Sequence, residues 1–159
     1  MIRELGAPGD FGWVVKEHGE RYTQEYGWDW RFEAMVARIV ADYATGRDAE
    51  REAAWIAEVD GERVGSIFCV DAHQDDTALL RLLLVGSRAR GLGLGSRLVD
   101  TCLEFARKAG YRRVRLWTTH PLVEARRLYL RRGFQLTAEE RHDGFGADLI
   151  GQTYELDLR

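Results

Sequence analysis

Hydrophobic residues recur at helical spacing along the first third of the chain. One set falls on a single face of a helix that follows Asp10 and ends at Gly27, namely Phe11, Val14, Val15, His18, Tyr22 and Tyr26. A second set repeats the spacing between Asp29 and Gly46. Each aspartate stands where a short polar side chain caps the first backbone N–H groups of a helix. The pattern predicts two amphipathic helices after a short first strand at 2–5.

From residue 54 onward the pattern is that of strands. Two apolar segments, 54–59 and 63–70, flank Asp60-Gly61, which is a hairpin signal. Segment 78–85 is apolar except for Arg81 and is typical of a strand buried on both faces. The remaining spacing predicts helices over 94–109 and 123–132 and strands over 113–118, 134–139 and 148–158. The order β-α-α-β-β-β-α-β-α-β-β predicts an α/β fold, a mixed sheet with helices on both faces.

Composition narrows the protein class. The chain has 159 residues, 45% of them hydrophobic and 31% charged, which predicts a single folded domain over 1–159. It has no 18-residue apolar run and no apolar leader, so we expect a cytoplasmic protein without a membrane span. Cys69 and Cys102 lie in apolar patterns and give neither a disulfide framework nor metal-ligand spacing. A net charge of -3 gives no general attraction to nucleic acid or membrane.

The segment 85–96 is rich in glycine and arginine and lies between the predicted strand 78–85 and the helix after it. Three glycines at alternate positions expose consecutive backbone N–H groups at a helix N-terminus, where the helix dipole favours an anion. Arg88 and Arg90 add charged donors. This chemistry suits a diphosphate.

Two other phosphate-binding motifs fit this loop poorly. A dinucleotide fingerprint needs G-x-G-x-x-G after the first strand, whereas this loop reads G-x-G-x-G with Ser96 in the last place and lies mid-chain. A Walker A loop needs Gly-Lys-Ser/Thr, which the loop lacks.

Two motifs resemble those of the GNAT family of N-acetyltransferases. Arg90-Gly-Leu-Gly-Leu-Gly95 resembles the family's R/Q-x-x-G-x-G/A loop, and Ala125-Arg-Arg-Leu-Tyr-Leu-Arg-Arg-Gly-Phe134 resembles its A-x-x-L-Y-x-x-x-G-F helix. The resemblance implies a mostly antiparallel sheet of six to seven strands. It also implies transfer of an acetyl group from acetyl-CoA to a primary amine of a small molecule or peptide, by direct attack in a ternary complex and with no metal.

The resemblance also implies roles for individual residues. Tyr129 matches the family's general acid, which gives a proton to the departing thiolate. Acetyl-CoA would lie between strands 78–85 and 113–118, its pantetheine paired with the free edge at Leu83, Leu84 and Val85. Its pyrophosphate would be held by the loop residues Arg88, Arg90, Gly91, Leu92, Gly93, Leu94, Gly95 and Ser96.

The sequence departs from the family pattern at two places. Leu122 stands where many members have an Asn that touches the cofactor, and the cofactor strand carries Arg81 and no acid to take the amine's proton. The general base is therefore open, with Glu20, Glu25, Asp29, His73 and His120 as candidates.

The acceptor pocket is expected between the first two helices. That segment combines acids with aromatic rings, which suits a cation. We expect Glu25, Tyr26, Trp28 and Trp30 to shape the pocket, with Phe145 on the opposite wall.

Alternatives follow from the same residues. The departures favour a non-catalytic acyl-CoA sensor as the second hypothesis, and nothing in the sequence excludes another acyl group. Segments 9–15, 25–29 and 145–155 resemble acetyltransferase modules fused to MarR-type regulators, which suggests a functional link to such a regulator. The alternation along 153–158 suits pairing across a homodimer. The Arg126, Arg127, Arg131 and Arg132 cluster is interpreted as a solvated face rather than a nucleic-acid site.

Overall fold

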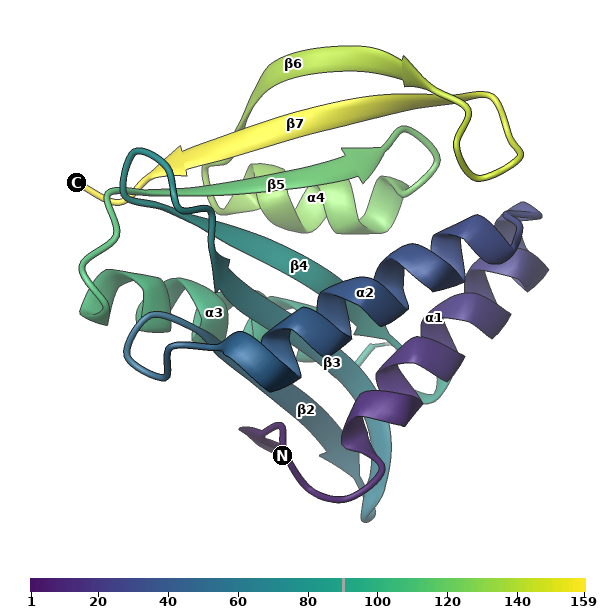
Figure 1. Ribbon diagram of the computed structural model, residues 1–159, viewed down its shortest axis with the longest axis horizontal. Coiled ribbons are helices and arrows are strands. Elements are labelled where there is room, and N and C mark those ends of the chain that lie inside the picture. Colours follow the sequence, from purple (N-terminus) through teal and green to yellow (C-terminus); the bar gives the residue numbers. More distant parts are fainter. Residues whose placement is uncertain (90) are drawn as a thin grey trace.

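The computed structural model describes residues 1–89 and 91–159. One seven-stranded sheet runs in the order β1-β2-β3-β4-β5-β7-β6 (Figure 1). Its strands are β1 (Ile2–Glu4), β2 (Ala53–Val59), β3 (Glu62–Asp71), β4 (Thr77–Val85), β5 (Arg113–Thr119), β6 (Gln135–His142) and β7 (Leu149–Asp157). The helices are α1 (Asp10–Tyr26), α2 (Trp30–Gly46), α3 (Leu94–Lys108) and α4 (Val123–Arg131), with a short 3-10 turn η1 (Ser87–Ala89). The predicted order of elements and the fold class are confirmed, and every strand pair but β4–β5 is antiparallel.

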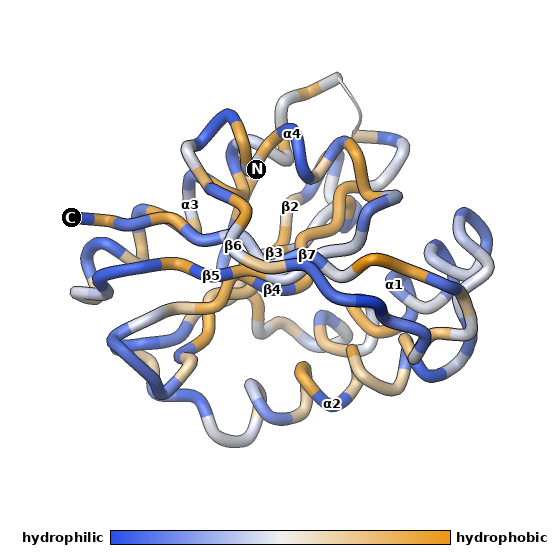
Figure 2. The backbone as a smooth tube through the Cα atoms, turned by 90° about the horizontal axis from the view of Figure 1, so that it is seen from above, coloured by the Kyte–Doolittle hydropathy of each residue, from blue (hydrophilic) through white to orange (hydrophobic). Residues whose placement is uncertain are grey.

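The sheet separates two hydrophobic cores because side chains alternate between its faces. On β2, Ala54 and Ile56 belong to the core under α1 and α2, whereas Trp55 and Ala57 belong to the core under α3. Figure 1 shows α1 and α2 in front of the sheet and α3 behind it. Hydrophobic stretches run along the central strands, while peripheral loops are mostly hydrophilic (Figure 2).

The β2–β3 hairpin has the predicted turn. Asp60 and Gly61 both have positive φ, 52° and 77°, as a two-residue type I′ turn requires.

Strands β4 and β5 diverge in the middle of the sheet. Their parallel pairing covers only Thr77–Leu79 against Arg113–Arg115, after which the strands separate (Figure 1). On its other side, β4 carries an extra residue opposite β3, and Leu82 at this bulge has a φ of 55°. The prediction of a strand buried on both faces is wrong here: Arg81 is exposed and Leu82 and Leu83 are half-buried, because this half of β4 borders an opening.

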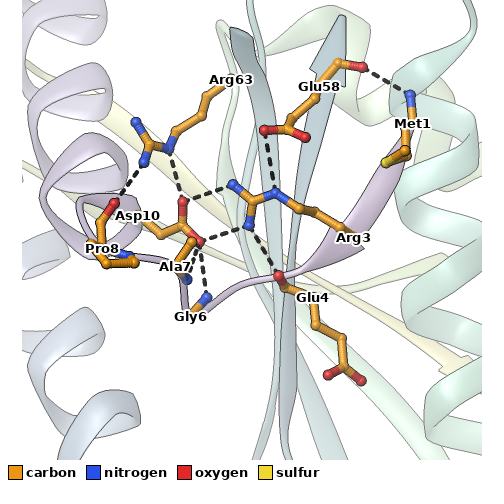
Figure 3. Close-up of polar contacts among 9 residues, drawn as sticks. All are labelled: Met1, Arg3, Glu4, Gly6, Ala7, Pro8, Asp10, Glu58 and Arg63. Carbon is orange, nitrogen blue, oxygen red and sulfur yellow. Dashed lines mark hydrogen bonds and ion pairs between the residues drawn. The ribbon is translucent and has the colours of Figure 1, made fainter. Parts of the chain in front are cut away.

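The predicted helix cap at Asp10 is also wrong. Asp10 is the first residue of α1, and its buried carboxylate accepts hydrogen bonds from Arg3, from Arg63 and from the backbone N–H groups of Gly6 and Ala7 (Figure 3). These partners hold the pKa of Asp10 well below its ordinary value of 3.8, the Arg3 hydrogen bond most of all. The cap predicted at Asp29 is confirmed, since its Oδ1 accepts from the backbone N–H of Arg31 at 3.0 Å.

None of the helices in the described part of the chain combines the length and the hydropathy that crossing a bilayer requires.

Candidate active site

A cavity of about 300 Å³ lies where β4 and β5 diverge. Its walls are Leu79–Leu83 of β4 and Arg115–Thr119 of β5, closed by aromatic side chains of α1 and α2. Tyr129 of α4 lines the same cavity. We call this space the central cavity. It opens through the sheet because the ladder between β4 and β5 ends after Leu79.

Two further cavities continue from the central cavity toward the glycine-rich loop. The first, of about 290 Å³, lies between Leu83–Val85 and the start of α4, and it shares Tyr22 and Leu83 with the central cavity. The second, of about 380 Å³, lies between the loop and α4 and shares Val85 and Leu128 with the first. A continuous groove therefore joins the interior of the sheet to the N-terminus of α3.

The loop is shaped by its glycines. Gly91 and Gly93 have φ values of 82° and 71°, in the left-handed region that favours glycine. A Cβ on Gly95 would lie 2.9 Å from Cδ1 of Leu128, so a larger residue there would require the Leu128 side chain to shift. The backbone N–H groups of Leu94, Gly95 and Ser96 belong to the first turn of α3, where intrahelical acceptors are lacking.

The predicted loop residues divide into two groups. Gly91, Gly93, Leu94, Gly95 and Ser96 line the outermost cavity, together with Arg127 and Arg131 of α4, which the sequence interpretation placed on a solvated face. Leu92 is exposed, and Arg88 pairs instead with Glu62 at the start of β3. The prediction for Arg90 lies outside the described residues.

The edge of β4 is less free than predicted. Leu83, Leu84 and Val85 all line the middle cavity, but the carbonyl of Val85 accepts a hydrogen bond from Nη1 of Arg21 at 2.6 Å. Arg21 also pairs with Glu17 one turn earlier on α1. Sequence reasoning missed Arg21 because nothing local connects α1 to a strand end 64 residues away.

The side chain of Tyr129 is buried and lines the central cavity from α4. Its ring packs against Phe134, at 5.8 Å between ring centroids. Burial raises the pKa of the phenol well above its ordinary value, and Tyr22 raises it further. The hydroxyl therefore stays protonated and keeps its hydrogen for donation.

The residues predicted for the acceptor pocket occupy different places. Trp28 is buried, lines the central cavity and stacks on Tyr22 at 5.2 Å and 11°. Glu25 and Tyr26 line the middle cavity beside β4. Trp30 is 74% exposed and lines none of the three cavities, and Phe145 is buried behind Trp28 at 5.1 Å. The segment is thus mainly a packed aromatic wall.

Among the five candidate bases, only Glu25 lines a cavity of the groove. Glu20 pairs with Lys16, and the carboxylate of Asp29 binds Arg31. His73 is exposed beside Asp71, and Nδ1 of His120 accepts from the backbone N–H of Ile150 at 3.0 Å.

His18 and Thr119 also line the central cavity. The sequence did not identify them as site residues, because His18 counts as part of an apolar helix face. Both are buried, and Nε2 of His18 and Oγ1 of Thr119 have no hydrogen-bond partner among the described residues. Burial lowers the pKa of His18 to about 4, so the ring is neutral. The signal in the sequence was only a histidine at an inward-facing helical position.

No cluster of three or more potential metal-binding side chains occurs within residues 1–89 and 91–159.

The chain is similar to acetyltransferases in sequence. The sequence model described as acetyltransferase (GNAT) family matches residues 12–134. N-acetyltransferase 8B of Rattus norvegicus is 33% identical over 108 residues, which cover 65% of this chain and 47% of that protein. N-acetylaspartate synthetase of Homo sapiens is 36% identical over 88 residues, 55% of this chain and 29% of that protein. The matched region therefore spans less than half of these curated relatives.

Solved structures share the fold. An N-acetyltransferase from Staphylococcus aureus Mu50 superposes with a TM-score of 0.80 at 19% identity, covering 100% of this chain and 98% of that one. The yncA protein of Salmonella typhimurium, solved with its cofactor acetyl-CoA, gives a TM-score of 0.75 at 20% identity, over 100% of this chain and 94% of that one.

Proposed function

Since the chain belongs to the acetyltransferase (GNAT) family, we propose that it transfers the acetyl group of acetyl-CoA to a primary amine in a ternary complex. The observation that carries this proposal is the continuous groove. It connects an anion-binding helix N-terminus to a buried phenol in the opening between β4 and β5. A long cosubstrate with a diphosphate near one end and a reactive thioester at the other matches both ends of such a groove.

The groove residues fit that cosubstrate. Backbone N–H groups of Leu94, Gly95 and Ser96, with Arg127 and Arg131, would hold the pyrophosphate. The pantetheine would follow Leu83–Val85, with the Val85 carbonyl shared with or released by Arg21. Acetyl-CoA supplies the activated acyl group when it is bound.

Tyr129 would serve as the general acid. The amine nitrogen forms a bond to the thioester carbonyl carbon, the C–S bond breaks, and the departing thiolate takes the phenolic proton. The nitrogen loses a proton to solvent, and the phenolate takes up a proton from solvent, which restores the phenol. Burial raises the pKa of the phenol, so the phenol is protonated when the thiolate departs. A backbone N–H at the Leu82 bulge, where the ladder to β3 is interrupted, would polarise the carbonyl oxygen.

The test is amine-dependent release of free thiol from acetyl-CoA, with mass spectrometry of the amine product. We expect one acetylated amine per thiol released. Tight acetyl-CoA binding without any amine-dependent thiol release would favour the alternative, a non-catalytic acyl-CoA sensor. Propionyl-CoA and succinyl-CoA in the same assay test the acyl preference.

Three finer expectations stay predictions: the cytoplasmic location, a homodimer, and the functional link to a MarR-type regulator. The expected pairing of segment 153–158 across the homodimer is wrong, because β7 is already hydrogen-bonded to β5 on one side and to β6 on the other. Sedimentation of the purified protein tests the homodimer.

A further inference from the structure

The central cavity has an aromatic wall and a cationic rim. Tyr22, Trp28 and Phe32 form the wall on the side of α1 and α2, and Trp117 of β5 adds a fourth ring. The charged residues that line the cavity are Arg81 and Arg115. Among the described residues, no aspartate or glutamate lines it, although the sequence pointed to acids that hold a cation. The cavity is therefore suited to an apolar body and a negative charge.

Arg81 is the cation on this rim that has no ion-pair partner in the described part of the chain. Arg115 is neutralised by Glu155, at 3.0 Å between Nε and Oε2. Arg81 makes no hydrogen bond or ion pair within the described residues, and it feels Asp42 of α2 only through the longer-range field. A planar guanidinium without an ion-pair partner binds a carboxylate through two parallel hydrogen bonds.

The register of β4 turns Arg81 toward α1 and α2. Arg81 stands directly opposite Phe68 of β3, and Phe68 belongs to the core under those helices. Directly paired residues of an antiparallel ladder share a face of the sheet. Arg81 is therefore on the face opposite α3, on the same side as His18 and the aromatic wall.

His18 offers one hydrogen-bond acceptor from this side. Its Nδ1 lies 2.8 Å from the carbonyl of Val14, which can only accept, so Nδ1 carries the proton. Nε2 is then unprotonated and carries a free lone pair. It is buried and has no partner among the described residues, and its ring lines the cavity. Such an acceptor is costly to leave unpaired and gains by meeting an N–H donor.

We propose that the acceptor is an amine that carries a carboxylate and an apolar or aromatic body, as an α-amino acid does. Arg81 binds the carboxylate, and Nε2 of His18 accepts a hydrogen bond from the attacking nitrogen. This proposal rests on the proposed acetyl transfer and names its substrate class. The hydrogen bond to His18 leaves the nitrogen lone pair free to face the thioester.

The experiment compares amino acids with the amines that lack only their carboxylate. L-phenylalanine is paired with 2-phenylethylamine, and L-leucine with 3-methylbutylamine, each compared at equal concentration of the unprotonated amine. We expect kcat/KM at least tenfold higher for each amino acid. Arg81→Gln should raise KM for L-phenylalanine at least tenfold and leave the values for 2-phenylethylamine unchanged. Arg38→Gln, on the exposed face of α2, is the matched control and should change neither.

His18 is tested by two variants that differ in one property. His18→Gln keeps an acceptor atom, whereas His18→Leu removes it. We expect His18→Leu to lose at least tenfold in kcat/KM for every amine, with acetyl-CoA affinity unchanged, and His18→Gln to recover part of that loss. A role confined to packing would make the two variants equivalent and would overturn the assignment of His18.

The outcomes separate this proposal from the proposed function. Equal kcat/KM for the acids and the plain amines would overturn carboxylate recognition and leave acetyl transfer intact. If no amine reacts, calorimetry with N-acetyl-L-phenylalanine and N-acetyl-2-phenylethylamine decides. If only N-acetyl-L-phenylalanine binds, and Arg81→Gln abolishes that binding, the carboxylate site is supported although acetyl transfer fails. Binding without preference would overturn the site.

Discussion

Arg3 donates two hydrogen bonds to the carboxylate of Asp10, from Nη1 to Oδ2 at 2.8 Å and from Nη2 to Oδ1 at 2.9 Å (Figure 3). Arg63 of β3 adds a third contact, from Nε to Oδ1 at 2.8 Å. One fully buried carboxylate therefore ties β1 and β3 to the first turn of α1, the helix that carries Arg21 and His18 into the groove.

Loss of the Asp10 charge should destabilise the fold. Asp10→Asn keeps the shape of the side chain but removes the anion that Arg3 and Arg63 share. Arg3 keeps Glu58 at 3.3 Å and both guanidinium groups are partly exposed, so we expect a loss at or below the about 3 to 5 kcal/mol that breaking a buried pair costs. Urea unfolding followed by circular dichroism measures the loss. Asp42→Asn, on the exposed face of α2, should change the free energy of unfolding by less than about 0.5 kcal/mol. A similar small effect for both variants would contradict the structural role of Asp10.

The same carboxylate predicts a pH dependence of stability. The folded pKa of Asp10 lies below its ordinary value of 3.8, so the unfolded chain takes up this proton first as the pH falls. The contribution of Asp10 is fully present above about pH 4 and is lost as the pH falls from there toward the folded pKa. Unfolding of the wild type should therefore lose stability in this range more steeply than that of Asp10→Asn.

His18 predicts a second loss of stability as the pH falls, in a range above that of Asp10. Its folded pKa of about 4 lies below the ordinary 6.5, because burial keeps the ring neutral. The unfolded chain binds this proton first, so stability is full above about pH 6.5 and decreases as the pH falls toward 4. The total is on the order of 3 kcal/mol. His18→Gln should flatten the Tm profile between these limits, whereas His73→Gln, at an exposed turn, should not. Parallel profiles for wild type and His18→Gln would contradict the burial of a neutral ring.

Removal of the Tyr129 hydroxyl should affect the chemical step alone. We expect Tyr129→Phe to lower kcat at least a hundredfold, as loss of a general acid does, with acetyl-CoA affinity within about threefold of wild type. Tyr111→Phe is the control, since its hydroxyl donates to the carbonyl of Arg51 and lines none of the three cavities. That variant should lose about 1 kcal/mol of stability and keep kcat. An unchanged kcat in Tyr129→Phe would remove the phenol from the mechanism.

The order of elements could be predicted from the sequence because local signals set it. Helical spacing and the glycines after each helix marked α1 to α4, and Asp60-Gly61 marked the hairpin. The glycine-rich loop was found for the same reason. Its chemistry, backbone N–H groups at a helix N-terminus, is encoded within a few consecutive residues.

The interior of the groove could not be predicted, because distant pairings create it. No residue pattern indicates that the pairing of β4 with β5 ends after Leu79. The central cavity forms because the pairing ends there. Asp10 was assigned as a helix cap because its partner Arg63 lies 53 residues away. Trp30 and Trp28 are two residues apart in the same aromatic segment, yet the start of α2 exposes one and buries the other.

The most direct test of the account is calorimetric titration of acetyl-CoA into wild type, Ser96→Glu and Ser87→Glu. The helix dipole stabilises a glutamate in the first turn of α3, so Ser96→Glu should fold, but its charge would stand in the proposed pyrophosphate site. Ser87 is exposed on η1 and lines none of the three cavities. We predict that wild type and Ser87→Glu bind acetyl-CoA with the same Kd. In Ser96→Glu we predict a Kd at least tenfold higher, which is a loss of about 1.4 kcal/mol of binding free energy. Equal binding by all three proteins, or none by the folded wild type, would contradict the assignment of the groove to acetyl-CoA.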